Sequence, residues 1–249
     1  MKLVYINYSD LNYREHQEKL IQHVLGNKLF DAAIPFTKEW LLETDFYNQN
    51  KKILDRDRLA GYAIWKPYII LEAFNHVEEG DVIVYMDCGD VPFPGIDQCI
   101  RDYMKVNDQY FLSQNHTGVH KWFTKRDCFY YMNCDSEKYW DAIQLEDGFM
   151  AFKKTEYNIN LLNEFLKYCC DERIVTDIPN QCGLENFEGF QDHRHDQSII
   201  TNLQLKYDLP RVVGHSGVRN FIQWNVLLHK DGEEYSNGSY NWGEMGCIA

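Results

Sequence analysis

Apolar and polar stretches alternate along the chain in a way that predicts strands separated by helices. Residues 2–7 form a largely aliphatic and aromatic run that stops at polar residues 7–10, as a buried first strand does. The clearest strand is the continuous apolar run at 82–86, typical of a sheet covered on both faces. Further strands are predicted at 110–113 and 148–152, and helices at about 13–25, 51–60, 66–74, 96–105, 155–170 and 194–206. This order predicts an α/β protein with a mixed, mostly parallel central sheet flanked by helices.

Composition narrows the functional class. The 249 residues include 38 acidic and 25 basic side chains, which gives a formal net charge of −13. Such a surface repels a polyphosphate backbone, so we expect no nucleic-acid partner. No apolar run approaches the roughly 18–20 residues that span a bilayer, and no signal segment is recognisable. Eight scattered cysteines in a chain of this length favour reduced thiols, so we expect a cytoplasmic protein without a transmembrane segment.

Two carboxylates, Asp87 and Asp90, follow the predicted strand at 82–86 directly, with Gly89 between them. In open α/β sheets, ligands bind outside the carboxyl ends of the strands. Carboxylates at the end of a buried strand are costly unless a positive group faces them. Magnesium or manganese fits this position, because these ions take one or two carboxylates together with substrate phosphates. The alternative is a plain strand-to-loop turn, and the spacing alone does not choose between the two.

Basic residues upstream point to a phosphorylated ligand. Arg58 and Lys66 precede the acidic pair in a chain that is short of positive charge. An arginine fork and a lysine point charge are the usual partners of a diphosphate. A solvated helix face explains the same residues without any ligand, and this alternative stays open.

Four segments follow one another along the chain: an Arg-Leu pair at 58–59, the strand and acidic pair at 84–90, and the stretches 144–152 and 196–202. With these residues the chain resembles nucleotide-sugar glycosyltransferases of the GT-A fold, most closely glycosyltransferase family 8. The stretches 61–70 and 193–200 also resemble capsule-type and viral glycosyltransferases. The resemblance covers about residues 1–220. The acidic motif departs from Asp-x-Asp, Glu146 and Asp147 stand where the family has Asn-Ala, and the family's late Lys-Pro is absent after residues 214–219.

The resemblance implies a Rossmann-like GT-A domain at 1–230, with a nucleotide-binding half at about 1–115 and an acceptor half at about 116–230. Residues 231–249 would form an irregular tail. The implied cofactor is Mn²⁺ or Mg²⁺, held by Asp87, Asp90 and His215. The implied donor site comprises Tyr5, Asn7, Arg58, Lys66, Asp87, His195 and Arg219. Tyr8 and Tyr13 either stack on the base or belong to the core.

The course of the implied reaction depends on a few side chains. An inverting enzyme needs a carboxylate as general base, and Glu146, Asp147 and Asp196 are the candidates. A retaining enzyme of the family type presents a polar side chain beneath the sugar, here Gln197 or Asp196. The Asp-Gln match at 196–197 favours retention.

The acidic and histidine-rich stretch at 192–196 has three interpretations. It caps and packs a following helix, it binds the donor sugar, or it binds zinc through the histidines and flanking carboxylates.

The expected function is transfer of a sugar from a nucleoside-diphosphate sugar, with UDP favoured, to a glycan or a protein-linked sugar. One alternative is a metal-dependent phosphohydrolase or nucleotidyltransferase, which needs a second metal ion and further carboxylates. The other is a noncatalytic module that binds nucleotide sugars.

Overall fold

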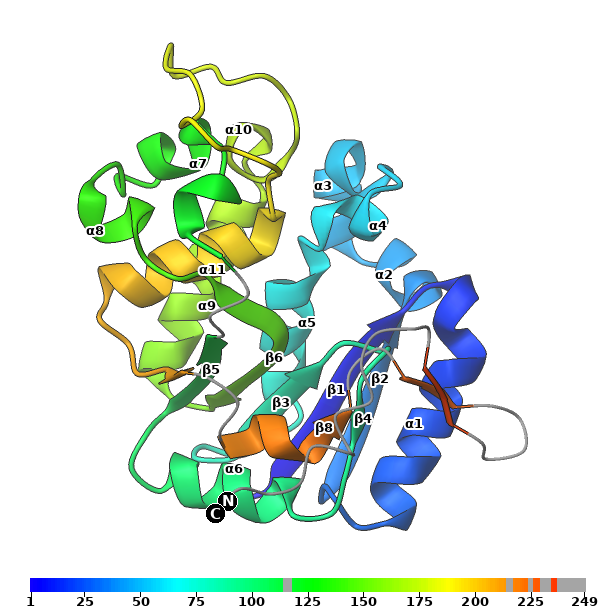
Figure 1. The fold of residues 1–249 in the computed structure, drawn as a ribbon. Coiled ribbons are helices and arrows are strands. Elements are labelled where there is room, and N and C mark those ends of the chain that lie inside the picture. The colour runs from blue at the N-terminus through cyan, green and yellow to red at the C-terminus, as the bar shows by residue number, and fades with distance from the viewer. Residues whose placement is uncertain (114–117, 214–216, 224–225, 229–233, 237–249) are drawn as a thin grey trace.

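The computed structural model describes residues 1–113, 118–213, 217–223, 226–228 and 234–236 (Figure 1). A six-stranded sheet with the strand order β2-β1-β3-β6-β5-β7 lies at its centre. Strands β1, β3 and β5 are completely buried. The strands are β1 (Leu3–Ser9), β2 (Ala32–Thr37), β3 (Val82–Met86), β5 (Gln109–Ser113), β6 (Leu145–Lys153) and β7 (Val212–Val213).

The sheet is mixed but mostly parallel, as predicted. Strand β1 pairs in parallel with β2 and β3, and β5 pairs in parallel with β7. Strand β6 alone runs antiparallel to its two neighbours, β3 and β5. Because of this reversal, the start of β6 lies beside the carboxyl end of β3, where Met86 is paired with Phe149.

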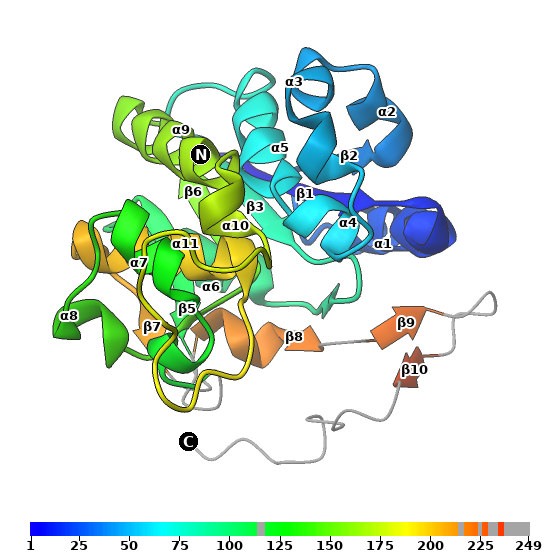
Figure 2. The same ribbon diagram turned by 90° about the horizontal axis from the view of Figure 1, so that it is seen from above.

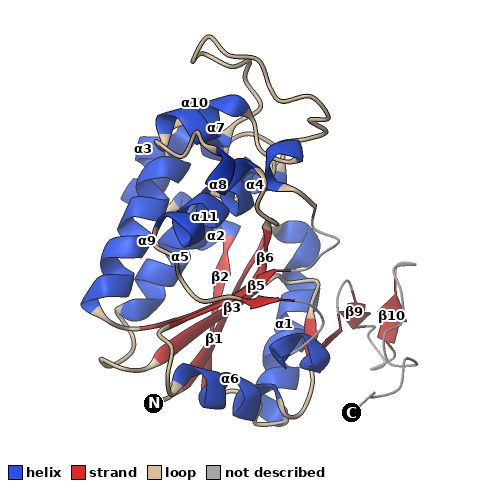
Figure 3. Cartoon of the chain, turned by 60° about the vertical axis from the view of Figure 1, so that its left-hand side comes forward, coloured by secondary structure: helices blue, strands red, loops and turns tan. Residues whose placement is uncertain are grey.

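Side chains of successive strand residues enter two separate cores, one on each face of the sheet. On one face, Ile6 and Ile83 pack beneath α5 (Trp65–Phe74), α9 (Glu156–Cys169) and α11 (His195–Lys206). On the other face, Tyr5 and Val84 pack beneath α1 (Arg14–Gly26) and α6 (Ile96–Met104). Figure 3 shows the sheet between these two groups of helices. The α/β fold class is therefore confirmed, with helices on both faces.

Shorter elements complete the described chain, and α7, α8 and α10 gather around α11 (Figure 2). None of the described helices is long and apolar enough to cross a membrane. The helical elements are η1 (Leu11–Tyr13), α2 (Lys38–Leu42), α3 (Asp45–Leu54), α4 (Leu59–Tyr62), η3 (His120–Trp122), α7 (Arg126–Tyr131), α8 (Glu137–Trp140), α10 (Glu172–Val175) and η4 (Gly217–Phe221). The short strands are β4 (Val91–Pro92), β8 (Ile222–Gln223), β9 (Val226–Leu228) and β10 (Glu234–Ser236).

The predicted helix at 51–60 is wrong in its second half. Helix α3 ends at Leu54, and residues 59–63 all have positive φ angles, between 49° and 92°. A side chain on Gly61 would meet the Cα atom of Leu54 at 2.6 Å, so only glycine lets the chain fold back so closely. The other positions in this left-handed turn carry side chains and are strained.

Three further points concern the edge strand, the two predicted halves and the predicted tail. The edge strand β2 was not predicted, because Pro35 interrupts its apolar pattern, and proline is tolerated at a sheet edge. The halves assigned to 1–115 and 116–230 stay a prediction. In the predicted tail, residues 231–233 and 237–249 lie outside the described residues, and Glu234–Ser236 pair with β9.

Candidate active site

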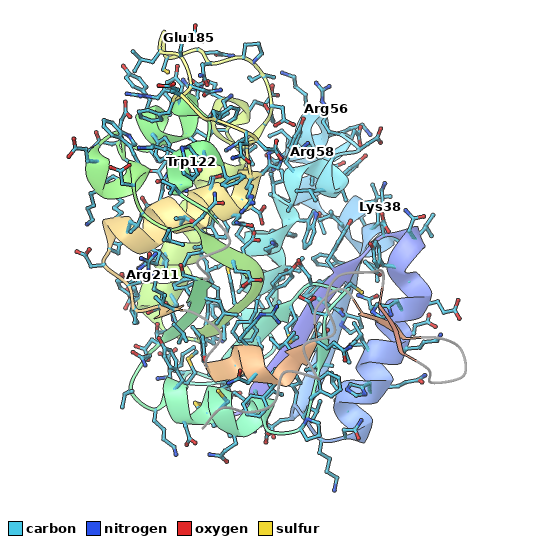
Figure 4. All side chains as sticks on the ribbon, viewed as in Figure 1. Lys38, Arg56, Arg58, Trp122, Glu185 and Arg211 are labelled. Atoms are coloured by element: carbon cyan, nitrogen blue, oxygen red, sulfur yellow. The ribbon has the colours of Figure 1, made fainter. Side chains whose placement is uncertain are left out.

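A cavity of about 600 Å³ opens at the carboxyl ends of β1 and β3. Strand-end clefts of this kind are where open α/β sheets bind ligands. Segments far apart in the sequence form its wall, and Arg58 stands at the upper side of the molecule in Figure 4. The cavity is lined by Tyr8, Asp10, Tyr13, Asp57, Arg58, Leu59, Ala60, Ala63, Trp65, Lys66, Tyr85, Asp87, Cys88, Gly89, Asp90, Asp147, Asp192, His193, Arg194, His195, Asp196 and Gln197.

The acidic pair Asp87 and Asp90 lies at the end of β3, as predicted. The Asp87 amide donates to the carbonyl of Gly148 at 2.8 Å, which continues the sheet by one bond. The Asp90 amide then donates to the Asp87 carbonyl at 3.1 Å and closes a tight turn. The Tyr85 hydroxyl donates to Oδ1 of Asp87 at 2.5 Å. Burial raises the pKa of Asp87 and the charge of Lys66 offsets this only in part, so an added positive ligand would lower the cost of the Asp87 charge.

Lys66 joins two further carboxylates in the cavity wall. It lies in the first turn of α5, and its Nζ is 2.8 Å from both Oδ2 of Asp147 and Oδ2 of Asp196. All three residues are buried. Asp147 comes from the start of β6 and Asp196 from the first turn of α11, so two non-local elements converge on one lysine.

The three groups share their protons unequally. Burial and the neighbouring Asp147 raise the pKa of Asp196 well above its ordinary value. Burial acts in the same sense on Asp147, but the charge of Lys66 and hydrogen bonds outweigh it and hold that pKa below its usual range. Burial opposes the charge on Lys66, yet the surrounding carboxylates raise its pKa. Of the two carboxyl groups, Asp196 is therefore the one whose protonated form is favoured, whereas Asp147 favours the ionised form beside the charged Lys66.

Arg58 and His195 also line the cavity, where they contact each other. The Arg58 Nε donates to Nε2 of His195 at 2.6 Å, and its Nη2 reaches both oxygens of Asp192 at 2.9 and 2.7 Å. Nδ1 of His195 donates to the carbonyl of Val175 at 2.8 Å. Burial lowers the pKa of His195, so the ring is neutral and can accept from Arg58.

The zinc interpretation of residues 192–196 gains no support. His193 binds the carbonyl of Ile174 through Nε2 at 2.8 Å, and burial lowers its pKa well below the ordinary value. Within the described ranges, no group of three or more His, Cys, Asp or Glu side chains is arranged to hold a metal ion. The stretch instead leads into α11, and residues 192–196 and the following Gln197 line the cavity.

Several predicted site residues do not reach the cavity. Tyr5 is fully buried against Phe30 on the opposite face of the sheet, with ring centroids 5.3 Å apart. Asn7 is also buried, and its Oδ1 accepts from Gln17 Nε2 at 2.8 Å. Neither Glu146 nor Arg219 lines the cavity, although both are described. His215 lies outside the described residues.

Tyr8 and Tyr13 line the cavity in place of Tyr5 and Asn7. Side chains alternate along β1, so Tyr8 leaves the strand on the face opposite to Tyr5 and stacks on Trp65 at 4.1 Å. Tyr85 was not predicted, although a hydroxyl two residues before Asp87 lies on the same side of the chain in an extended strand. Gln144, whose Oε1 accepts from Gln197 at 3.0 Å, was not predicted as a site residue either, because no spacing rule links these positions.

The fold and the site define an α/β protein with an acidic ligand cleft at the carboxyl edge of its sheet.

No protein-family model matches the chain, and no curated protein matches it significantly. The structure is similar to that of a glycosyltransferase involved in the glycosylation of the major capsid of PBCV-1, at 8% identity and TM-score 0.44, over 86% of this chain and 81% of that chain. It is also similar to mouse xyloside xylosyltransferase 1, at 9% identity and TM-score 0.41, over 85% and 84%. The WbbM bifunctional glycosyltransferase is similar at 11% identity and TM-score 0.44, over 81% of this chain and 37% of that chain. Likenesses this distant do not transfer a function, so the chemistry of the site must carry the functional inference.

Proposed function

We propose that this protein is a metal-dependent glycosyltransferase that uses a nucleoside-diphosphate sugar, with UDP favoured, and acts on a glycan or a protein-linked sugar. One observation carries the proposal: Asp87 and Asp90 end a buried strand inside the same cavity as Lys66, Asp147 and Asp196. A volume of about 600 Å³ is within the range of small-molecule sites. The resemblance of the four sequence segments points to the same chemistry.

The acidic pair fits a divalent cation. Its donor set is carboxylate oxygen, which Mg²⁺ and Mn²⁺ prefer, and these ions complete their shell with water and substrate phosphates. The Asp87 carboxylate accepts from the neutral Tyr85 hydroxyl, and burial raises its pKa, so an added cation would relieve the cost of its charge. Asp87 and Asp90 would hold the ion, and His215 stays a proposed third ligand. When bound, the cation would offset the negative charge that develops on the diphosphate leaving group.

The protonation of the inner cluster supports a retaining course. An inverting reaction needs a carboxylate that accepts a proton from the acceptor hydroxyl, and its pKa should lie near the working pH. Asp147 has a lowered pKa and is tied to Lys66, so it is a weak base. Burial and Asp147 favour the protonated form of Asp196, and a protonated carboxyl cannot accept a proton. Gln197 lies beside them in the cavity wall, and Gln144 fixes the direction of its amide.

The two-metal alternative needs carboxylates placed close enough to share two ions, and the aspartates of the described cavity are not arranged in that way. A phosphohydrolase or nucleotidyltransferase of that type holds its ions about 4 Å apart with shared ligands. The described residues contain no metal-binding group of three or more His, Cys, Asp or Glu. A noncatalytic module would bind the nucleotide sugar without turning it over, so a turnover measurement separates it from the proposed enzyme.

Calorimetry and turnover with manganese test the proposal. UDP should bind in the presence of Mn²⁺, and chelation of the metal or Asp87→Asn should weaken binding by about tenfold or more, since a metal–phosphate link is lost. UDP-sugar hydrolysis should fall in parallel.

Asp102→Asn, in an exposed pair with Lys105 on α6, is the matched control and should bind UDP normally. Metal-independent UDP binding, or normal binding by Asp87→Asn, would contradict the proposal. Cleavage of simple phosphoesters without a sugar donor would favour the two-metal alternative.

A further inference from the structure

The cations of the cavity wall are all engaged by side chains of the protein itself. Among the described residues that line the cavity, Arg58, Lys66 and Arg194 carry positive charge. Lys66 is buried and paired with both Asp147 and Asp196 at 2.8 Å. A ligand group that sought this ammonium would have to displace a buried carboxylate.

The two arginines are engaged as well. Arg58 holds both oxygens of Asp192, and its Nε lies 3.4 Å from Oδ2 of Asp177. Arg194 donates from Nη1 to Oε1 of Gln144 at 3.1 Å, and its guanidinium stacks 3.8 Å from the centroid of the Phe123 ring. The nearby Asp147 and Asp192 charges also act on Arg194. The two histidines of the wall add no charge, because burial keeps both rings neutral.

This wall is where the sugar must lie if the proposed function holds. Asp87 and Asp90, which follow β3, are assigned to the metal and the diphosphate. Asp196 and Gln197, assigned to the reacting carbon, stand on a different element, at the start of α11. The sugar attached to the diphosphate therefore contacts Asp147, Asp192 and Asp196, together with the cations that these carboxylates hold.

We infer that the donor carries a neutral sugar, a hexose or pentose without a carboxylate, and that the site rejects uronic-acid donors. Hydroxyl groups of a neutral sugar can donate to Asp147 and Asp192 while the existing ion pairs stay intact. A uronate carboxylate can only accept, so it must either face these carboxylates or take a cation from one of them. Removing one partner of the buried Lys66 pairs is costly, the half-exposed Arg58–Asp192 pair costs less to separate, and like charges placed together add to the cost.

Calorimetry with UDP, UDP-glucose and UDP-glucuronate in the presence of Mn²⁺ tests this inference, which rests on the proposed function. UDP-glucuronate should bind about tenfold or more weakly than UDP-glucose. Asp192→Asn removes a half-exposed carboxylate that holds Arg58. This variant should narrow the ratio of the two dissociation constants by about threefold. Asp102→Asn, in the exposed pair on α6, should leave the ratio unchanged.

The outcomes separate this inference from the proposed function. If UDP does not bind with Mn²⁺, the proposed function fails and the inference falls with it. If UDP and UDP-glucose bind but UDP-glucuronate binds equally well or more tightly, the proposed function stands and the neutral-sugar assignment is overturned. If the wild type prefers UDP-glucose to UDP-glucuronate and Asp192→Asn leaves that preference unchanged, the preference does not come from the charge pairs, and that assignment is overturned.

Discussion

Two acidic groups share one cavity, but their charges are balanced in different ways. Asp147 and Asp196 are brought together by β6 and α11, and Lys66 pairs with both at 2.8 Å. Asp87 follows β3, and its carboxylate accepts from the neutral Tyr85 hydroxyl at 2.5 Å. Lys66 supplies the countercharge that keeps Asp147 ionised, whereas at Asp87 its effect is weaker than that of burial, so an added cation would improve the balance there. A group neutralised by folding should matter most for stability, and one balanced by a ligand should matter most for binding.

Removal of the Lys66 charge is the strongest test of this contrast. Lys66→Met keeps the length of the side chain but leaves the buried Asp147 carboxylate without its cation. Loss of one partner from a buried ion pair typically costs about 3–5 kcal/mol, so the free energy of unfolding in urea should fall by that amount. Lys105→Met, which removes a lysine from an exposed pair with Asp102, is the matched control and should cause no measurable change.

The double variant Lys66→Met/Asp147→Asn shows whether the loss comes from the stranded charge. It removes both charges of the pair, so it should be more stable than Lys66→Met alone. Equal unfolding free energies for Lys66→Met and the wild type would show that the fold does not depend on this lysine. A double variant less stable than the single one would assign the loss to packing instead.

Asp196→Asn should change how stability depends on pH. The folded-state pKa of Asp196 lies above its unfolded value, because burial and Asp147 favour the neutral acid. At pH values between the two, the folded state holds a proton that the unfolded state has lost, so this contribution to stability falls as the pH rises. It is fully present below the unfolded pKa and is lost as pH rises through the folded one. Asparagine cannot ionise, so the variant lacks this loss.

Urea unfolding at a series of pH values measures this difference. The wild type should lose stability relative to Asp196→Asn as the pH rises above the ordinary range of an aspartate. The effect should be smaller than that of Lys66→Met, because the lysine still faces Asp196 when it ionises. Parallel profiles for the two proteins would mean that Asp196 is already ionised in the folded state at the lowest pH tested.

The two acidic groups also differ in how far the sequence could predict them. Asp87 and Asp90 were predictable, because a continuous apolar strand fixes its own carboxyl end, and ligands bind there in open α/β sheets. Four of the six strands of the sheet and most of the long helices followed from the same local periodicity, whereas the edge strands β2 and β7 did not. The ion pairs of Lys66 were not predictable, since they depend on the antiparallel insertion of β6 between β3 and β5. No local pattern specifies that pairing.

Differences between the predicted residues and the observed cavity lining or fold have equally specific causes. Tyr5 and Asn7 belong to the correct strand end, but their side chains leave β1 on the face away from the cavity, whereas Tyr8 faces it. The helix predicted across 51–60 failed because Gly61 packs against the backbone of Leu54, a contact that the helical pattern does not reveal. The alternation of side chains along β3 would have placed Tyr85 on the same side as Asp87. The backbone turn at 59–63 could be seen only in the structure.

Tyr85→Phe gives the smallest expected effect and sharpens the contrast on the side of Asp87. The substitution removes only the hydroxyl that donates to Oδ1 of Asp87 and leaves the ring in the core. A hydrogen bond to a charged group contributes about 1.5 kcal/mol, so the free energy of unfolding should fall by roughly that much.

The hydrogen bond also lowers the pKa of Asp87, against the larger effect of burial, so its loss should raise that pKa further. Metal binding requires the ionised carboxylate, and calorimetry should therefore show Mn²⁺-dependent UDP binding moving to higher pH. Tyr157→Phe, on the exposed surface of α9, should change neither quantity. An unshifted pH profile with a normal loss of stability would mean that Tyr85 supports the fold but does not tune the metal-binding carboxylate.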